Sequence, residues 1–503
     1  MITIGTPTLQ AGRLLDRVTA CDPLGSDGNG EDAMRFEDYR RHDAVGLAAL
    51  VAKGEVSPGE LLETAVTRMA EVNPKVNAVT LDLAERARKE LPSTPTEGAL
   101  SGVPFLLKDL GAGLAGTATT SGSAVFKDNV PQADSPLTTA YKAAGLVIFG
   151  KTNTPEFGLT PVTESALFGP CRNPWDLSRT SGGSSGGAAA AVAAGILPAA
   201  HASDGGGSIR IPAAACGLFG LKPSRGRVSF APNGEGWGGA SAMHAVTRSV
   251  RDSAVLLDIA CRPQPGDPYY LDAPATPFAG EVGRAPRKLR IGFTTAGLAA
   301  PILDTEVIQA VKDAARLCES LGHAVEEVSL PGDLAAMQLG AGNVIGASVA
   351  ATLDAEGKRR GRPVEEGEVE PLTWITLQRG KGVTGSDYVQ GLAAIHAYGR
   401  AMAGLFATYD VVLMATLGGP AIPVGYLYED LRQFAPRLFA FMPNTQAFNN
   451  TGQPAMSVPL AWNAEGLPLG LQFVGRMADE ATLFRLAGQL EAASPWFDRV
   501  APL

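Results

Sequence analysis

Two serines lie in separate glycine-rich segments, an arrangement that is typical of acyl-transfer chemistry. Ser184 lies within residues 181–187 (SGGSSGG), and Ser208 lies within residues 203–212 (SDGGGSIRIP). A serine hydroxyl can attack a carbonyl carbon, and glycines let several backbone N–H groups approach the oxyanion that then forms. A pair of flexible turns would show the same glycine content, so this pattern alone leaves both interpretations open.

Lys108 is a candidate base for such a serine. It follows residues 103–107 (VPFLL), an apolar run that predicts a buried strand with the amine at its end. Burial disfavours the charged amine, and a fall in pKa from about 10.4 to about 7–8 lies within what desolvation and dipoles produce in enzymes. A lysine at a strand end is more often a solvated surface charge, so this residue needs support from elsewhere in the sequence.

Histidine is the usual base for a serine nucleophile, but no histidine of this chain stands in a convincing arrangement. His201 lies seven residues before Ser208, which is a weak basis for a catalytic pair, and His323 follows a glycine at a predicted helix end, where a capping role is favoured. A His-dependent esterase with Ser184 as nucleophile is the weaker alternative. The five histidines are His42, His201, His244, His323 and His396.

Two other glycine motifs suggest different functions, and each lacks its structural context. Residues 182–186 match the G-x-S-x-G nucleophile elbow, which must follow a buried strand, whereas residues 173–181 are polar and contain a proline. Residues 111–116 match a dinucleotide-binding fingerprint, but residues 117–123 are not typical of a helix start. Neither serine-containing segment ends in the Gly-Lys-Ser/Thr of a phosphate-binding loop, so we expect no nucleotide cofactor.

The composition argues against several classes of partner. A formal net charge of -9, with scattered Lys and Arg, gives no basic surface for nucleic acid. No run approaches about 18 continuous apolar residues, so we expect no membrane-spanning segment. The cysteines form no C-x-x-C pair, and no His/Cys/Asp cluster has ligand spacing, so we expect no disulfide framework, no metal and a cytoplasmic protein. The cysteines are Cys21, Cys171, Cys216, Cys261 and Cys318.

Apolar and helical patterns alternate along the chain, which is typical of an α/β fold. Asp43 and Asp304 predict the starts of two helices, and Ser57 with Glu60 forms the capping box of a third. Short apolar runs bounded by turn residues predict buried strands at residues 103–107, 146–149, 289–293 and 411–414.

A proline-rich connection and an N-terminal segment indicate the domain organisation. Six prolines in residues 262–287 predict a long surface connection. Residues 1–40 are expected to form an N-terminal arm or extension. Residues 41–503 are expected to form one domain, which the connection could divide into two lobes.

Lys108, the loop of residues 182–187 and residues 204–212 together resemble the amidase signature family. The similarity covers about residues 43–495 and includes further matching segments at 150–156 (GKTNTPE), 172–176 (RNPWD), 216–223 (CGLFGLKP) and 452–455 (GQPA). The resemblance implies an α/β/α sandwich around one large mixed β-sheet. It also implies a hydrolase that cleaves amide-type carbon–nitrogen bonds without a cofactor.

In that family the catalytic residues are a serine, a second serine held in a cis peptide and a lysine, which correspond here to Ser208, Ser184 and Lys108. The resemblance implies that neutral Lys108 accepts a proton from Ser184, which accepts one from Ser208 as Ser208 attacks the carbonyl. Ser184 would then protonate the leaving nitrogen. Ser185 is expected to hydrogen-bond within this network of serines.

The resemblance places the oxyanion hole at the backbone N–H groups of Gly205, Gly206, Gly207 and Ser208. Gly205 departs from the family pattern, which usually has threonine or another larger residue at this position. The departure predicts a looser loop or a wider pocket.

Four other residues are expected to support or line the site. Asp204 and Arg210 flank the nucleophile and are expected to form a structural pair. Phe157 and Gly158 follow the matching segment 150–156 and are expected to contact the substrate.

Within the family, the sequence is most similar to the branch that contains 6-aminohexanoate cyclic-dimer hydrolases and related linear-amide, aryl-amide and carbamate hydrolases. The expected substrate is a small-molecule amide, carbamate or ester, and a homodimer is the expected form of any self-association. Residues 266–279, 337–364 and 424–449 match no family motif, and we expect them to form loops that build the substrate pocket.

Two alternatives stay open. The glutaminase-like subunits of transamidation complexes share the same three catalytic residues, so a partner-dependent role in such a complex is one of them. A binding protein that keeps the motif without using it is the other.

Overall fold

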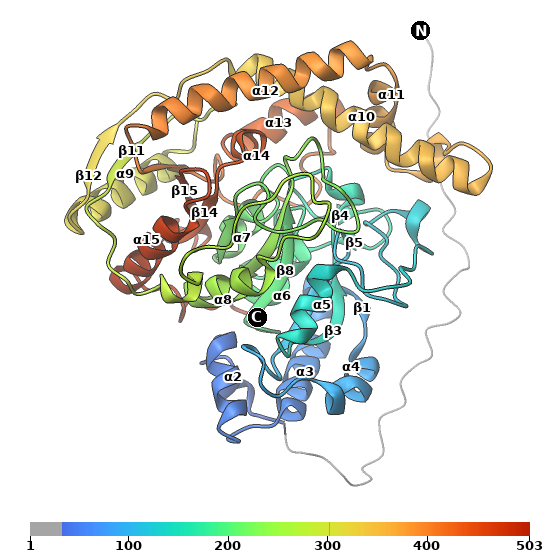
Figure 1. Cartoon of the computed structure of the whole chain (residues 1–503), viewed down its shortest axis with the longest axis vertical. Coiled ribbons are helices and arrows are strands. Elements are labelled where there is room, and N and C mark those ends of the chain that lie inside the picture. Colours follow the sequence, from blue (N-terminus) through green and yellow to red (C-terminus); the bar gives the residue numbers. More distant parts are fainter. Residues whose placement is uncertain (1–32, 301) are drawn as a thin grey trace.

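The computed structural model describes residues 33–300 and 302–503, which form a layered α/β structure around a large mixed sheet (Figure 1). The sheet has eight strands in the order β12-β11-β13-β15-β14-β9-β10-β8. Strand β11 pairs in parallel with β12 and β13, and the other pairs are antiparallel. The predicted α/β class is confirmed. The strands are β8 (Ala199–Asp204), β9 (Phe219–Lys222), β10 (Ala242–Thr247), β11 (Arg290–Phe293), β12 (Ala324–Glu327), β13 (Val411–Ala415), β14 (Ala455–Trp462) and β15 (Pro468–Gly475).

A three-stranded sheet of order β1-β3-β2 continues the layer beside β8. Strand β2 lies alongside β8, where the Lys108 N–H donates to Nδ1 of His201 at 3.2 Å. A side chain therefore takes part in the contact between β2 and β8. The one large mixed sheet that was predicted is the eight-stranded sheet. These strands are β1 (Val79–Asp82), β2 (Pro104–Lys108) and β3 (Val147–Thr152), and two short pairs are β4 (Glu164–Ser165) with β5 (Gly169–Pro170) and β6 (Arg172–Asn173) with β7 (Asp176–Thr180).

Helices cover the sheet in two layers. Helices α6 and α7 pack together over β8, β9, β14 and β15, and α8 and α15 pack together over β9, β10, β14 and β15. The α-helices are α1 (Phe36–Tyr39), α2 (Ala44–Ala52), α3 (Pro58–Val76), α4 (Ala84–Glu90), α5 (Pro136–Ala143), α6 (Gly186–Ala193), α7 (Arg210–Cys216), α8 (Val250–Ala260), α9 (Thr305–Ser320), α10 (Leu334–Arg360), α11 (Pro371–Lys381), α12 (Gly385–Phe406), α13 (Phe434–Phe441), α14 (Gln446–Thr451) and α15 (Glu480–Ala493). The 3-10 turns are η1 (Leu91–Ser93), η2 (Ala124–Phe126), η3 (Glu156–Gly158), η4 (Phe278–Gly280), η5 (Glu366–Glu368) and η6 (Leu431–Gln433).

Side-chain caps begin the helices where the sequence predicts them. Asp43 accepts a hydrogen bond from the N–H of Gly46 at the start of α2, and Ser57 and Glu60 form a complete capping box at the start of α3. Asp304 caps α9 in the same way. These three helix starts are confirmed, because each cap satisfies an N–H group that has no partner inside its own helix.

The first described residues are packed against the core. The side chain of Tyr39 in α1 is buried, and its hydroxyl donates to the carbonyl of Ile196 at 3.2 Å. An arm reaching to residue 40 was therefore predicted too long. Its residues 1–32 lie outside the described part of the chain.

The proline-rich connection of residues 262–287 contains η4 and is otherwise without helix or strand. Phe278 of η4 is buried against Phe484 of α15, with ring centroids 5.6 Å apart. Strand β11, which follows the connection, joins the same sheet as β8, β9 and β10, which precede it. The connection therefore does not divide the protein into two lobes.

Residues 337–364 are not the loop that was predicted, because most of them belong to helix α10. This helix packs against α11 and α12 at one edge of the molecule (Figure 1). By length and composition alone it could cross a membrane, with a mean hydropathy of 1.3. Its residues Met337, Val344 and Leu353 are buried in clusters with the neighbouring helices, and 39% of its most apolar stretch lies inside the structure.

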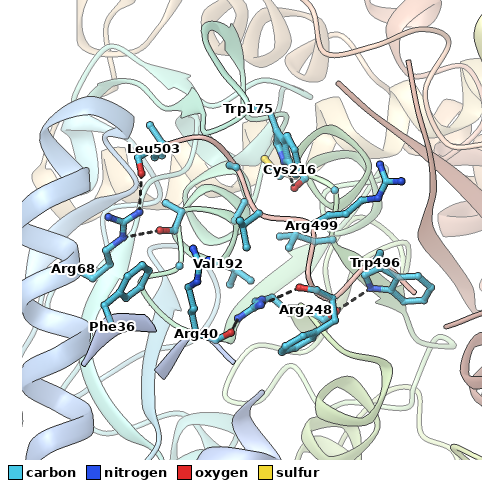
Figure 2. A pocket seen from close by; sticks show the side chains of 18 of the residues that line it. Phe36, Arg40, Arg68, Trp175, Val192, Cys216, Arg248, Trp496, Arg499 and Leu503 are labelled. Carbon is cyan, nitrogen blue, oxygen red and sulfur yellow. Dashed lines mark hydrogen bonds between the residues drawn. The ribbon is translucent and has the colours of Figure 1, made fainter. Parts of the chain in front are cut away.

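The C-terminal segment is held by hydrogen bonds to Arg68 and Arg248. A hollow of about 190 Å³ lies at this place (Figure 2). The Arg248 guanidinium donates there to the carbonyl of Phe497, and the indole of Trp496 donates to the carbonyl of Arg248. Arg68 of α3 donates to the carbonyl of Leu503 at 3.4 Å. These bonds join the end of the chain to α3 and to Arg248, which lies just before α8.

Gly380→Ala should loosen the junction of α10 and α11. A Cβ at Gly380 would lie 1.9 Å from the carbonyl oxygen of Gly346, and backbone atoms cannot move aside cheaply. We expect the free energy of unfolding to fall by about 1–3 kcal/mol, as in other overpacked cores. Urea unfolding followed by circular dichroism measures it.

Gly404→Ala in α12 is the matched control, because an added Cβ meets nothing within 4 Å there. Alanine favours a helix over glycine, so this variant should be neutral or stabilised by up to about 1 kcal/mol. Equal stabilities for the two variants would contradict the packing argument.

Candidate active site

Lys108 ends strand β2 with its amine inside the protein. The side chain is 0% exposed, and Nζ donates to Oγ of Ser184 at 2.7 Å and to Oγ of Ser203 at 3.0 Å. Burial lowers the pKa of the Lys108 amine to about 7, although the nearby charge of Asp204 acts in the opposite direction. The amine can therefore be neutral near neutral pH, which a base requires.

Ser184 lies in the glycine loop between β7 and α6, where the Gly183–Ser184 peptide bond is cis. The loop packs closely on its surroundings, since a Cβ at Gly183 would lie 2.7 Å from the backbone nitrogen of Val162. The hydroxyl of Ser184 contacts the lysine amine rather than an imidazole. The nucleophile-elbow interpretation with a histidine base is therefore wrong.

Ser208 lies between β8 and α7, is 7% exposed and lines a cavity that Ser184 also lines. The N–H of Ser185 donates to the carbonyl of Ser208 at 3.2 Å and joins the two glycine loops. Within residues 33–300 and 302–503, Oγ of Ser208 makes no hydrogen bond. The hydrogen bond between Ser208 and Ser184 that the expected proton transfer requires is therefore not formed in this structure. Hydrogen bonds of this kind often tighten only when substrate is bound.

The backbone N–H groups around Ser208 divide into used and free donors. The Gly207 N–H donates to Oδ1 of Asp204 at 2.7 Å, so its predicted place in the oxyanion hole is corrected. In the described part of the chain, the N–H groups of Gly205, Gly206 and Ser208 have no hydrogen-bond acceptor. These three donors are therefore available for an oxyanion.

Asp204 and Arg210 form a fully buried ion pair under the nucleophile loop. Arg210 Nε lies 3.0 Å from Asp204 Oδ2, and Arg210 also donates to the side chains of Asn449 and Gln472. Burial opposes the ionised carboxylate, but the charge and hydrogen bonds of Arg210 hold the pKa of Asp204 well below its usual range. Because Asp204 also accepts the Gly207 N–H, the pair fixes the conformation of the loop that carries Ser208.

Comparison with known proteins identifies the family. Residues 60–484 match the family model described as Amidase. The chain is 37% identical over 474 residues to a 6-aminohexanoate-cyclic-dimer hydrolase of Paenarthrobacter ureafaciens, and the match covers 91% of this chain and 96% of that relative. The chain belongs to the amidase signature family.

Solved structures agree with this assignment. The amidase superposes on a 6-aminohexanoate cyclic dimer hydrolase with a TM-score of 0.88 and 35% identity, covering 92% of this chain and 99% of that one. A bacterial aryl acylamidase superposes with a TM-score of 0.84 and 27% identity over 92% of this chain and 99% of its own. The protein is therefore an amidase-family hydrolase of amide bonds.

Ser185 and Ser203 differ from the sequence prediction. The hydroxyl of Ser185 donates to the carbonyl of Ser203 and accepts from its N–H, so it binds backbone instead of the other serine hydroxyls. Ser203, which the sequence analysis missed, provides the second oxygen on the lysine amine. Alternation along β8 was a usable signal, because His201 and Ser203 lie on the same side of the strand and both contact Lys108.

The buried histidines have structural partners. Burial lowers the pKa of His201 to about 3, and its Nδ1 accepts the N–H of Lys108. Burial likewise lowers the pKa of His244 to about 3, and its Nε2 hydrogen-bonds with Ser253. The N–H of His323 donates to the carbonyl of Cys318 at the end of α9, which confirms a capping role for its backbone. Its ring accepts from the N–H of Leu289 and hydrogen-bonds with Gln489 of α15.

A cavity of about 460 Å³ is lined by Ser184, Ser203 and Ser208. The predicted contact residues Phe157 and Gly158 line it, and a Cβ at Gly158 would lie 3.0 Å from Oγ of Ser184. Among the three unmatched segments, only residues 337–364 reach the cavity, through one face of α10. Glu235 is the one charged residue in the lining, as far as the chain is described.

No three His, Cys, Asp or Glu side chains within the described ranges are grouped so as to hold a metal ion. The hollow in Figure 2 contains none of the predicted catalytic residues. Ser184, Ser203 and Ser208 line the cavity of about 460 Å³ instead.

Asp204→Ala should destabilise the amidase strongly, because it leaves the buried guanidinium of Arg210 without its counter-charge. Removing one partner of a buried pair typically costs about 3–5 kcal/mol of the free energy of unfolding. Urea unfolding provides the measurement.

Asp354→Ala is the matched control, since Asp354 pairs with Lys381 on the surface. An exposed pair contributes about 0–1 kcal/mol. A loss as small for Asp204→Ala as for this control would show that the buried pair does not hold the loop.

Proposed function

We propose that this amidase hydrolyses small-molecule amides through an acyl-enzyme on Ser208, with Ser184 as proton relay and Lys108 as base. One observation carries the proposal: the buried, neutralisable amine of Lys108 lies 2.7 Å from the Ser184 hydroxyl. Ser208, Gly205, Gly206 and the other cavity residues are arranged around that pair.

The proton path follows from this geometry. As Oγ of Ser208 forms a bond to the carbonyl carbon, its proton passes to Oγ of Ser184, and the proton of Ser184 passes to Nζ of Lys108. The negative charge moves to the carbonyl oxygen, where the N–H groups of Gly205, Gly206 and Ser208 donate. Each essential donor of this kind lowers the barrier by about 3–4 kcal/mol in other acyl-transfer enzymes.

Collapse of the tetrahedral intermediate completes the first half of the reaction. The carbon–nitrogen bond breaks, the leaving nitrogen takes the proton from Ser184, and Ser184 regains one from Lys108. Water then attacks the ester on Ser208 by the same path, releasing the acid and restoring the serine. The proposal uses no metal and no cofactor.

The cavity wall indicates the kind of substrate. Phe126, Phe157, Phe230 and Val349 line the cavity and give it apolar surface beside the three serines. Such a wall fits linear, cyclic or aryl amides, and an ester or carbamate of similar shape would place its carbonyl in the same position. One relative is named as a hydrolase of the 6-aminohexanoate cyclic dimer and another as an aryl acylamidase, which supports a cyclic or aryl amide as substrate.

A hydrolysis screen of the purified chain tests the proposal. Aryl amides, straight-chain aliphatic amides, carbamates and small esters are incubated with the chain alone, without ATP or other proteins. Turnover supports the proposal and argues against a glutaminase-like subunit. Labelling of Ser208 by an acylating reagent with no turnover of any amide would contradict the proposal.

Ser208→Ala should abolish covalent labelling by serine-directed reagents without unfolding the protein, because one oxygen is the acyl acceptor. Mass spectrometry of the intact protein measures the adduct. Ser184→Ala is the matched variant, and it should still form an adduct at Ser208, more slowly. An adduct on Ser184 in the Ser208→Ala protein would instead make Ser184 the nucleophile.

Lys108 should set the acidic limb of the rate profile. The lysine must be neutral to accept a proton, and burial lowers its pKa to about 7, so the rate should rise as the pH rises through about 7 and then level off. Lys108→Ala should lower amide turnover by several orders of magnitude, about 10³-fold or more, and ester turnover by less, because esters have better leaving groups. Initial rates on an amide and an activated ester at several pH values measure both effects.

Lys222→Met is the control for this assignment, because burial also lowers the pKa of Lys222 to about 7. The acidic limb should persist in that variant and in neutral variants of His201 and His244. Loss of the limb in any of these three, with amide turnover retained in Lys108→Ala, would show that the lysine mechanism is wrong.

A further inference from the structure

The space above Gly205 is filled by a side chain from another loop. A Cβ at Gly205 would lie 2.7 and 2.8 Å from two carbons of the Trp237 indole, and 3.2 Å from Oγ of Ser241. Gly205 does not have a left-handed backbone conformation, so its own φ would accept any L-residue. The indole of Trp237 is therefore what requires glycine at this position.

The loop that carries Trp237 is held in place from several sides. Trp237 has a φ of 55°, a conformation that bulky residues rarely adopt. Arg225 donates to the carbonyl of Gly239 at 2.6 Å, and Asn449 donates to the carbonyl of Ala240 at 3.0 Å. These bonds hold the residues that follow Trp237, so the surroundings fix a strained backbone beside the cavity.

The same loop joins the nucleophile loop to the α10–α12 helices. A Cβ at Gly238 would lie 3.0 Å from Cγ1 of Val344 in α10 and 3.3 Å from Cδ2 of Leu392 in α12. Trp237 itself lines the cavity together with Gly205 and Ser208. The indole thus lies against Gly205, whose N–H is one of the free donors, while the next residue of its loop, Gly238, packs against α10 and α12.

We propose that Trp237 is a specificity-determining residue that, with Gly205 as its steric complement, selects amides unbranched at the carbon next to the scissile carbonyl. This inference rests on the proposed function. A carbonyl oxygen bound by the N–H of Gly205 brings the adjoining carbon of the substrate towards the indole. A straight alkyl chain or a flat ring can pass along the indole face, whereas a tertiary carbon meets the ring.

Trp237→Ala should relax this selection. The probes are two anilides of the same amine, one with a straight-chain hexanoyl group and one with a branched pivaloyl group. The ratio of kcat/KM for the branched anilide to that for the straight one should rise about tenfold or more relative to the unaltered chain, because the indole no longer occupies the space. Trp237→Phe keeps a smaller aromatic ring at this position and disturbs the fold less than Trp237→Ala. It should raise the ratio by an intermediate factor.

A double-variant cycle tests the steric coupling. Gly205→Ala alone should lower kcat/KM for the straight anilide about tenfold or more, because its Cβ meets the indole. Adding Trp237→Ala should return the activity to within about threefold of that of Trp237→Ala alone. Gly206→Ala is the matched control in the same loop, since its Cβ would meet only Met442 and Gln446 near 4 Å, and Trp237→Ala should not rescue any loss it causes.

The outcomes separate this inference from the proposed function. If the unaltered chain hydrolyses neither anilide nor any other amide of the screen, the proposed function fails. If it hydrolyses the straight anilide but the branched-to-straight ratio is unchanged in folded Trp237→Ala and Trp237→Phe, Trp237 does not set specificity. Equal rescue of Gly205→Ala and Gly206→Ala by Trp237→Ala would also overturn the pairing.

Discussion

The amine of Lys108 sits where water cannot solvate its charge, and much of the structure around the site follows from that constraint. A fall in pKa from 10.5 to about 7 corresponds to roughly 5 kcal/mol of lost stabilisation of the charged form. The amine lies at the end of β2, and β8 lies alongside this strand. The hydroxyl oxygens of Ser184 and Ser203 contact the amine. Asp204 moderates the shift, so that the amine stays within reach of protonation during the reaction.

A second buried charge, Arg210, holds together parts of the chain that are distant in sequence. Its guanidinium reaches Asp204, the carbonyl of Thr445, Asn449 and Gln472. Asn449 in turn donates to the carbonyl of Ala240, next to the loop that carries Trp237. One polar network therefore positions the nucleophile loop and a wall of the cavity together, and a fully satisfied buried network is rigid because any broken bond leaves an unpaired group.

The sequence predicts best what local patterns determine. The caps at Asp43, Ser57 and Asp304 and the strand that ends in Lys108 depend on neighbours within a few residues, and the structure has them as predicted. The use of the Gly207 N–H by Asp204 could not be predicted in this way, because it depends on how the carboxylate turns once Arg210 is buried. Helix α10 was missed because residues 337–364 match no family motif and were assigned to pocket loops for that reason. Its glycines Gly340 and Gly346 are contact points for α12 and α11.

Position 205 shows why a departure from a family pattern cannot be interpreted from one residue. A glycine in place of a larger side chain predicts extra room, and the backbone at Gly205 would indeed accept a side chain. The room is absent, because the indole of Trp237 occupies it from a loop more than thirty residues further along the chain. Close packing of protein interiors makes such exchanges of volume between distant positions the normal outcome, since a void beside a buried loop would forfeit its contacts. The size and shape of this cavity therefore depend on Gly205 and Trp237 together and cannot be predicted from either residue alone.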